Sequence, residues 1–311
     1  TQGMRCIGAL LACRLMSCFA GLSCLPCIPT GSQQKLSITA KFVGEKVCHS
    51  TPSDSDHNAI VFTFKNGRQQ LASLLSWNIL CQYGYNEQWG FPFDGFCRRS
   101  EASADYMKRL DRTAAEVKSL VDLHNPDAIL LQECAEGHEF GHGVITQHLD
   151  KILSPLGYTV LHDGEFVTAV RGDSAQIALP ALQRQSGKIH AVHCEKLNCI
   201  ILNVHLNWDK AGSENPGKTR EDLDKLTKHL RSVYPSSHIL LAGDTNRVPS
   251  GWELRQQVDP DASTIEQLGD GFGTLGYPPG PTNVRWSGEA KGSEMTYADF
   301  SLWIPPADQS T

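Results

Sequence analysis

Two side chains that could act on a phosphate or a metal ion follow a short apolar run near residue 240. The segment 239–242 reads Ile-Leu-Leu-Ala, the length of one buried strand, and Gly243, Asp244 and Asn246 follow it. Side chains two residues apart on an extended chain point to the same face, so a carboxylate and a carboxamide would emerge side by side. For a lone Asp-x-Asn, a simple turn is the better explanation. The functional interpretation therefore depends on other polar residues at strand ends.

Several other apolar segments also end in polar side chains. These are Asn78, Glu133, His205 with Asn207, Asp299, and Asp56 with His57. Carboxylate and amide oxygens suit Mg²⁺ or Mn²⁺, which few protein ligands hold together with phosphate oxygens. Histidine and asparagine side chains can neutralise charge at a phosphoryl group. A single polar residue at a strand end usually makes only a local hydrogen bond, but the set as a whole indicates a metal-dependent phosphoryl site.

The hydrophobic pattern predicts the elements that would position these residues. Apolar residues at spacings of three and four predict helices over 101–124, about 144–154 and about 219–233. Strands are predicted between 34 and 64 and at 71–77, 128–131, 158–162, 166–170, 188–193, 199–205, 239–242 and 297–303. Residues 81–100 and 251–290 are predicted to be loops. Strands and helices mixed in this way predict a layered α/β domain.

One hairpin can be predicted in more detail. Residues 59–64 and 71–77 should be antiparallel neighbours, because Asn66-Gly67 between them is a strong hairpin signal. Their ends would place His57 and Asn78 at the same edge of a sheet.

The motifs around these residues resemble those of the endonuclease/exonuclease/phosphatase superfamily, the metal-dependent fold of deoxyribonuclease I, abasic endonucleases, inositol polyphosphate phosphatases and poly(A) deadenylases. They are Trp77-Asn-Ile-Leu80, Leu131-Gln-Glu133, Asn203-Val-His-Leu-Asn-Trp-Asp209, Ala242-Gly-Asp-Thr-Asn246, Ala298-Asp-Phe300 and Ser55-Asp-His57. The residues at 78–82 and 205–209 resemble those of the deadenylase-like branch. The resemblance implies a four-layer α/β sandwich, with two mainly antiparallel sheets packed face to face and flanked by helices.

The resemblance also implies which residues bind the metal and activate water. Glu133 would be the main ligand of Mg²⁺ or Mn²⁺, with Asn78 and Asp56 assisting. Asp244 would orient and deprotonate the attacking water. Such a reaction needs positioning, a cation and an in-line water more than covalent chemistry.

The same resemblance implies the residues that contact the phosphate. His205 and Asn246 would bind it, and His57, polarised by Asp299, would stabilise the charge that builds on phosphorus. The substrate-binding residues expected in addition are Asn207 and Asn283. In one respect the chain departs from the family pattern, since Thr245 stands where Phe is usual in Gly-Asp-Phe-Asn.

The order of the motifs is a larger departure. Ser-Asp-His normally closes the chain, whereas here Ser55-Asp-His57 comes first and is followed by a segment like the family's last strand. Our hypothesis is a circular permutation, in which the Asn-Gly turn joins the usual last and first strands. The alternative is that 34–64 is the tail of an upstream copy, so that the domain lacks its own histidine. A separation of more than about 10 Å between His57 and Asp244 would exclude the permutation, since the contact needs hydrogen-bond reach.

A competing motif suggests a different metal chemistry. His138-Glu-Phe-Gly-His142 matches the zinc-protease pattern, and His148 falls where a third ligand could lie. The pattern requires a helix, which Gly137, Gly141 and Gly143 disfavour by about 1 kcal/mol each relative to Ala. Exposed loop histidines are the better explanation.

The remaining features of the sequence concern the domain division, a possible leader, the net charge and the cysteines. Residues 1–33 are predicted to be a leader or disordered segment before a single domain at 34–306. Residues 4–28 resemble a signal peptide, so the protein is secreted if they act as one and intracellular otherwise. Arg14 interrupts their apolar run, so no stable membrane span is expected. The net charge is −6 and no Lys/Arg run is present, so the sequence gives no sign of a long groove that binds nucleic acid. Cys81, Cys134 and Cys199 are expected to be buried free thiols.

The sequence therefore predicts a monomeric, divalent-metal-dependent phosphoesterase, and a nuclease-like phosphodiesterase is our first interpretation. Two features favour a nucleic-acid 3′ end as substrate: the deadenylase-like motif residues, and the aromatic loop at 83–96, which could stack bases. A phosphoinositide or sphingolipid headgroup is the second candidate. A catalytically inactive relative that acts as a binding module is a third, and the zinc protease is a remote fourth.

Overall fold

The computed structural model describes residues 36–44, 55, 57–79, 103–134, 143–172, 175–177, 189–206, 218–245, 266–268, 273–276, 283–286, 293–296 and 299–306. By its contacts the chain divides into residues 1–35 and residues 36–311, and all described residues lie in the second unit. The predicted leader, the loop at 81–100 and the motif at 138–142 lie outside the described residues.

The first sheet has six strands in the order β1-β2-β3-β4-β6-β5. The strands are β1 (Leu36–Val43), β2 (Ala59–Asn66), β3 (Gln69–Asn78), β4 (Ala128–Gln132), β5 (Tyr158–Asp163) and β6 (Phe166–Arg171). The predicted hairpin is confirmed, because β2 and β3 are antiparallel neighbours. All neighbours in this sheet are antiparallel except β3 and β4.

The second sheet has seven strands in the order β11-β12-β15-β10-β9-β8-β7. They are β7 (Ala175–Ile177), β8 (Ile189–Cys194), β9 (Cys199–His205), β10 (His238–Asp244), β11 (Glu266–Leu268), β12 (Gly273–Gly276) and β15 (Asp299–Ile304). Among the described strands of this sheet, β9 and β10 form the one parallel pair. A separate pair, β13 (Asn283–Trp286) with β14 (Ser293–Thr296), forms a two-stranded sheet.

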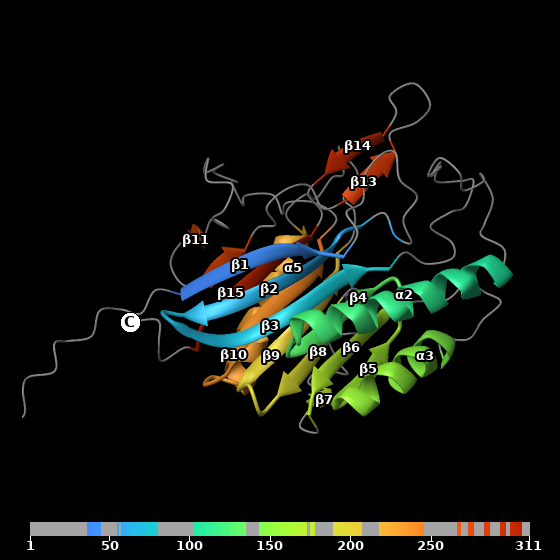
Figure 1. Ribbon diagram of the computed structural model, residues 1–311. Helices are drawn as coiled ribbons and strands as arrows, with labels where there is room; N and C mark the ends of the chain where they lie inside the picture. Colours follow the sequence, from blue (N-terminus) through green and yellow to red (C-terminus); the bar gives the residue numbers. More distant parts are fainter. Residues whose placement is uncertain are drawn as a thin grey trace, which may run out of the picture. The chain divides into compact units, whose positions relative to one another are not determined.

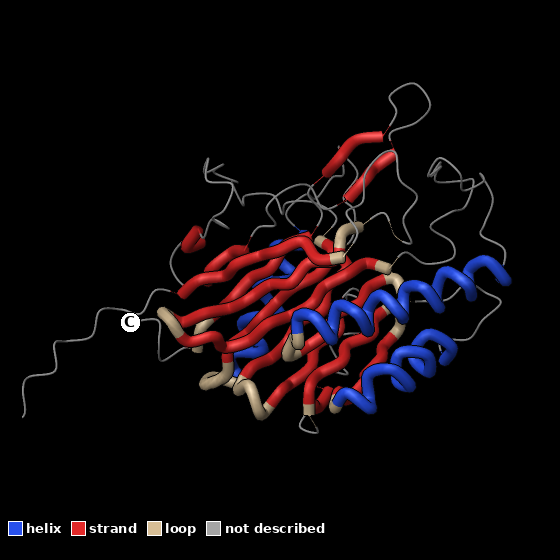
Figure 2. The backbone as a smooth tube through the Cα atoms, in the orientation of Figure 1, coloured by secondary structure: helices blue, strands red, loops and turns tan. Residues whose placement is uncertain are grey.

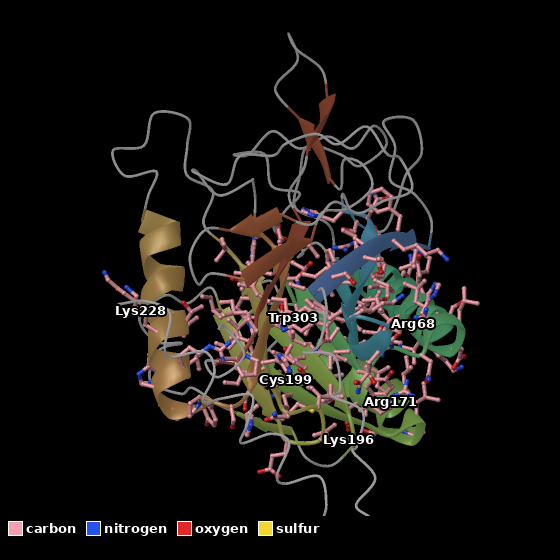
Figure 3. All side chains as sticks on the ribbon, turned by 90° about the vertical axis from the view of Figure 1, so that its left-hand side faces the viewer. Arg68, Arg171, Lys196, Cys199, Lys228 and Trp303 are labelled. Atoms are coloured by element: carbon pink, nitrogen blue, oxygen red, sulfur yellow. The ribbon has the colours of Figure 1, made fainter. Side chains whose placement is uncertain are left out.

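The two sheets pack face to face, and alternate residues of their strands fill the layer between them. Phe62 and Leu74 of the first sheet, and Ile201, Leu240 and Trp303 of the second, belong to one buried cluster. This follows from the two-residue period of a strand, which sends every second side chain to the inner face. Figure 3 shows Trp303 and Cys199 inside this layer, whereas Lys228 projects from the far side of the second sheet's helix. The expected buried thiols Cys134 and Cys199 are confirmed.

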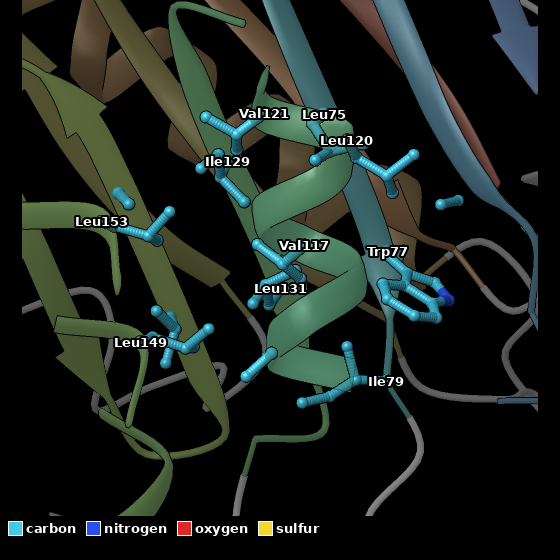
Figure 4. Packing of buried hydrophobic residues seen from close by; sticks show 14 of the residues in the cluster. Leu75, Trp77, Ile79, Val117, Leu120, Val121, Ile129, Leu131, Leu149 and Leu153 are labelled. Carbon is cyan, nitrogen blue, oxygen red and sulfur yellow. The ribbon is translucent and has the colours of Figure 1, made fainter. Parts of the chain in front are cut away.

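Helices cover the outer faces of both sheets (Figures 1 and 2). The first sheet is covered by α2 (Ser103–His124) and α3 (Gly143–Leu153), which is followed by the short 3-10 helix η2 (Ser154–Leu156). Residues of α2 and α3 pack on Trp77, Ile129 and other outward side chains of β3 and β4 (Figure 4). The second sheet is covered by α5 (Lys218–Val233) through Leu226 and Leu230. The layers are therefore helix, sheet, sheet, helix, and the predicted four-layer sandwich of mainly antiparallel sheets is confirmed.

One prediction was incomplete. Residues 251–290 were expected to form loops, but β11, β12 and β13 lie in this range. The segment Gly273–Gly276 carries little local strand signal, and it is a strand because it pairs with β15. None of the described helices is both long and apolar enough to span a bilayer.

Candidate active site

The ends of four central strands converge at one end of the sandwich. In each sheet the two central strands are parallel, so both strands of the pair end at the same edge. The register pairs Asn78 with Gln132 in the first sheet and Asp244 with His205 in the second. Glu133 follows directly after β4. The topology therefore brings together residues that are far apart in the chain.

Asn78 joins the two carboxylates of the site. Its side-chain nitrogen donates to Glu133 Oε1 at 2.9 Å and to Asp244 Oδ2 at 2.9 Å. Asn78 and Asp244 are buried, whereas Glu133 is partly exposed. An amide that donates both hydrogens fixes both carboxylates without adding a charge. This contact also connects the first sheet with the second.

Glu133 lies in a strained backbone conformation, with φ of 57°. Gln132 is the last residue of β4, and continued extended geometry would turn the next side chain to the outer face of the sheet. The left-handed conformation at Glu133 breaks this alternation, and its carboxylate reaches Asn78. Non-glycine residues in this region are uncommon and are held there by their surroundings. The Cys134 N–H donates to the Glu165 carbonyl at 2.8 Å immediately after this turn.

His205 is held between three carboxylates. Its Nδ1 lies 2.8 Å from Glu165 Oε2, and its Nε2 lies 3.7 Å from Glu133 Oε1 and 3.7 Å from Asp244 Oδ2. Burial lowers the pKa of His205. The hydrogen bond to Glu165 and the charges of Asp244, Glu133 and Glu165 outweigh this effect and raise the pKa from 6.5 to about 8. Glu165 thus fixes the ring and leaves Nε2 directed at the centre of the site.

His57 reaches the same centre from the segment before β2. Its Nε2 lies 3.5 Å from Asp244 Oδ2, and both side chains are buried. Two contacts hold its backbone: the Ser55 hydroxyl accepts from the His57 N–H at 3.1 Å, and the Trp77 indole N–H donates to the His57 carbonyl at 3.0 Å. Ser55 in turn donates to the Asn78 carbonyl. The predicted contact between His57 and Asp244 is therefore present, well inside the limit of about 10 Å that hydrogen-bond reach sets.

Gly243 allows β9 and β10 to approach closely beside the site. It has φ of 148°, and a Cβ added there would lie 2.1 Å from the Val204 carbonyl oxygen. No other residue fits without displacing β9. The pairing of Asp244 with His205 in the next position of the register therefore depends on this glycine.

The described residues fit a divalent metal ion. One ligand atom each from Glu133, His205 and Asp244 lie within 4.8 Å of one another. Carboxylate oxygens are the ligands that Mg²⁺ and Mn²⁺ prefer, and the imidazole nitrogen would also suit softer ions. The clustered carboxylates favour a cation at this point, so the set forms a candidate metal site without selecting Mg²⁺ in particular.

The remaining predicted site residues are described only in part or not at all. Asp56, Asn207 and Asn246 lie outside the described residues. The backbone of Asp299 lies opposite Asp244 in the antiparallel pair of β10 and β15. Asn283 begins β13 and pairs with Thr296, in the separate two-stranded sheet.

Glu165 is a site residue that the sequence patterns did not indicate. It lies in the turn between β5 and β6, opposite His205 on the other sheet. Asp163-Gly164 is a hairpin signal that would have placed the next residue at a sheet edge. Its partner, however, is 40 residues away, and no local pattern identifies it.

Comparisons with known proteins find similar solved structures. No protein-family model matches the chain, and no curated protein matches it. Among solved structures, TDP2 from C. elegans is similar with a TM-score of 0.44 and 19% identity, over 76% of this chain and 65% of that chain. An AP endonuclease from Archaeoglobus fulgidus has a TM-score of 0.35 and 16% identity, over 49% of this chain and 58% of that one.

A third similar structure is the 3′-5′ exonuclease NExo from Neisseria meningitidis, with a TM-score of 0.32 and 19% identity, over 45% of this chain and 55% of that one. The chain thus spans less than two thirds of each of these three structures.

Proposed function

We propose that this chain is a divalent-metal-dependent phosphoesterase of the endonuclease/exonuclease/phosphatase type. The observation that carries the proposal is the convergence of Asn78, Glu133, His205, Asp244 and His57 at one end of the sandwich. Two carboxylates, one amide and two imidazoles around one point form a set that can hold a cation, orient water and bind a phosphate.

Glu133 and Asp244 would hold the metal ion, and His205 would complete the set or bind the phosphate. A bound divalent ion would polarise the phosphoryl oxygens and neutralise their charge. Asn78 keeps the two carboxylates at a fixed distance by donating to both. Glu165 accepts from Nδ1 of His205, so the N–H or lone pair at Nε2 faces the substrate.

Asp244 is the proposed base. Its buried carboxylate, which accepts from Asn78 at 2.9 Å, would accept a proton from the attacking water. His57, whose Nε2 lies 3.5 Å from the same carboxylate, would donate to a phosphoryl oxygen as charge builds there. Asp299, opposite Asp244 in the register, is the proposed partner that polarises His57.

The contact between His57 and Asp244 supports the circular-permutation hypothesis over the fragment hypothesis. In the fragment hypothesis the domain would lack a histidine at this position, whereas His57 occupies it from the segment that leads into β2, the strand next to Asn78. We therefore propose a single domain at 34–306, with residues 34–64 supplying the strand and the motif that usually end the chain.

A phosphodiester at a nucleic-acid 3′ end is our proposed substrate, because the residues at 205–209 resemble the motif of the deadenylase-like branch. A phosphoinositide or sphingolipid headgroup is the alternative, since the same site chemistry would act on its phosphate. Neither requires a long basic groove, because the metal ion supplies local positive charge.

The proposal is tested by a phosphoesterase screen over RNA, DNA and lipid headgroups, with and without Mg²⁺ or Mn²⁺. Asp244→Ala should lower the metal-dependent rate by at least about 10²-fold, because it removes the proposed base. Asp122→Ala is the matched control, since Asp122 is an exposed carboxylate that pairs with Lys118 on the surface of α2. Equal rates for the wild type and Asp244→Ala would exclude catalysis at this site. Metal binding without hydrolysis of any phosphoester would favour the binding module.

A further inference from the structure

A layer of buried polar side chains lies directly beneath the site, between the two sheets. Its members are Ser76 of β3, Gln132 of β4, Thr168 of β6, His190 of β8 and Asn203 of β9, all buried. The other inner-face positions are mostly apolar. Polar groups in such a layer destabilise a fold unless they are hydrogen-bonded to one another, so the connections within it are informative.

The central contact of this layer crosses from one sheet to the other. The Gln132 side-chain nitrogen donates to Asn203 Oδ1 at 2.7 Å and to the Leu130 carbonyl at 3.1 Å. It also lies 3.4 Å from the Ser76 hydroxyl. The Gln132 side chain therefore joins β4 and β3 of the first sheet to β9 of the second.

The orientation of Asn203 is fixed by its other contacts. Its side-chain nitrogen donates to the Leu131 carbonyl at 3.1 Å, the Val167 carbonyl at 3.2 Å and the Thr168 hydroxyl at 3.2 Å. Its oxygen must point to Gln132, because rotation of the amide would place this oxygen against the carbonyl oxygens of Leu131 and Val167. Asn203 thus binds the backbone of β4 and β6 while it accepts from Gln132.

The amide pair of Gln132 and Asn203 lies close to the candidate metal ligands in the sequence of both strands. Gln132 is the residue immediately before Glu133, and Asn203 precedes His205 by two positions on the same face of β9. A hydrogen bond between these two residues sets the local distance between the sheets next to the candidate ligands. Glu133 comes from one sheet, whereas His205 and Asp244 come from the other.

We propose that Gln132 and Asn203 are positioning residues, whose cross-sheet hydrogen bond holds Glu133 at the distance from His205 and Asp244 that a divalent ion requires. The proposal rests on the proposed function, because it assigns the amide pair to the metal site of that function. Residues that orient metal ligands commonly change metal affinity by about 10–100-fold when replaced.

The test measures the affinity of the purified protein for Mn²⁺ by titration calorimetry, without any substrate. Gln132→Met keeps the size of the side chain but removes the donor, and it should weaken Mn²⁺ binding by about 10–100-fold. Ile201→Val and Leu240→Ala are the matched controls, because both side chains are buried in the layer between the sheets, and each lies four residues before a candidate ligand on its strand. They should leave Mn²⁺ affinity within about threefold of the wild type, although they span a range of lost stability.

The comparison is made at equal thermal stability, so that a general loss of packing does not count as positioning. If Gln132→Met does not fold, Gln132→Asn replaces it, since the shorter amide keeps the donor but cannot reach Asn203 at 2.7 Å without movement. Asn203→Leu and the double variant complete a cycle. The double variant should bind Mn²⁺ little worse than either single variant, because one contact has been removed in all three.

The outcomes separate this proposal from the proposed function. A wild type that hydrolyses phosphoesters while Gln132→Met binds Mn²⁺ as the controls do would overturn the positioning role alone. A wild type that binds Mn²⁺ but hydrolyses nothing would overturn the proposed function, and weakened binding in Gln132→Met would still support the positioning role. A wild type that binds no Mn²⁺ would overturn both.

Discussion

At the scale of single residues, Glu133 occupies a backbone conformation that its residue type disfavours. Its φ of 57° turns the carboxylate inwards to Asn78. A left-handed backbone at a residue with a Cβ destabilises the fold by roughly 1–2 kcal/mol. Such strain persists where the side chain has a use that only this conformation permits.

Replacement of Glu133 by glycine and by alanine should distinguish the effect of losing the carboxylate from the effect of backbone strain. Both variants lose the proposed ligand, so both should lose metal-dependent activity. Glu133→Gly should nevertheless be more stable than Glu133→Ala by about 1 kcal/mol, because glycine adopts positive φ without the penalty. Urea unfolding of the two metal-free variants measures the difference. Equal stabilities would mean that the left-handed backbone at this position is unstrained.

At the scale of elements, the site depends on how closely the parallel strands β9 and β10 approach. Gly243 permits this approach, since a Cβ would lie 2.1 Å from the Val204 carbonyl oxygen and 2.9 Å from its nitrogen. The contacted atoms belong to the backbone of a central strand, which cannot move aside as a flexible side chain can.

Gly243→Ala should therefore destabilise the protein by roughly 2–3 kcal/mol through overpacking and should abolish activity by shifting Asp244 relative to His205. Gly157→Ala is a suitable control, because Gly157 also has positive φ, of 82°, but a Cβ there meets nothing within 4 Å. Thermal unfolding and the rate on the best substrate measure both effects. A similar loss in the two variants would show that backbone conformation matters at Gly243 rather than contact with β9.

The elements also show which features the sequence could predict. The helices α2, α3 and α5 follow from periodicity, because each has one apolar face, and the central strands follow from short apolar runs, because both of their faces are buried. The Asn66-Gly67 turn correctly predicted that His57 and Asn78 share an edge. Local patterns could not predict β12, which is a strand only because β15 pairs with it. Nor could they predict that Glu165 holds His205, since that contact depends on how the two sheets face each other.

At the scale of the whole molecule, the polar layer between the sheets couples folding to pH through His190. Asn203 donates to the Thr168 hydroxyl, which also lies 2.9 Å from Nδ1 of His190. Nε2 of His190 has no hydrogen-bond partner among the described residues, so a protonated ring would leave an unpaired N–H in this layer. Protonation of His190 would place a charge in the layer that joins the two sheets.

Burial lowers the pKa of His190 from 6.5 to about 4; the Asp163 carboxylate opposes this shift and His162 adds to it. Between these two values the unfolded chain binds more protons than the folded protein, so stability rises with pH. As the pH falls from about 6.5 to about 4, His190 should therefore remove roughly 3 kcal/mol of the free energy of unfolding, and the loss should level off below about pH 4. Urea unfolding at a series of pH values measures this slope. In His190→Gln, whose amide can still pair with Thr168, the loss of stability over this pH range should be smaller by about this amount, whereas His229→Gln on the exposed face of α5 should leave the loss unchanged. If His190→Gln keeps the full slope of the wild type, the acid sensitivity of the sandwich arises elsewhere than in this layer.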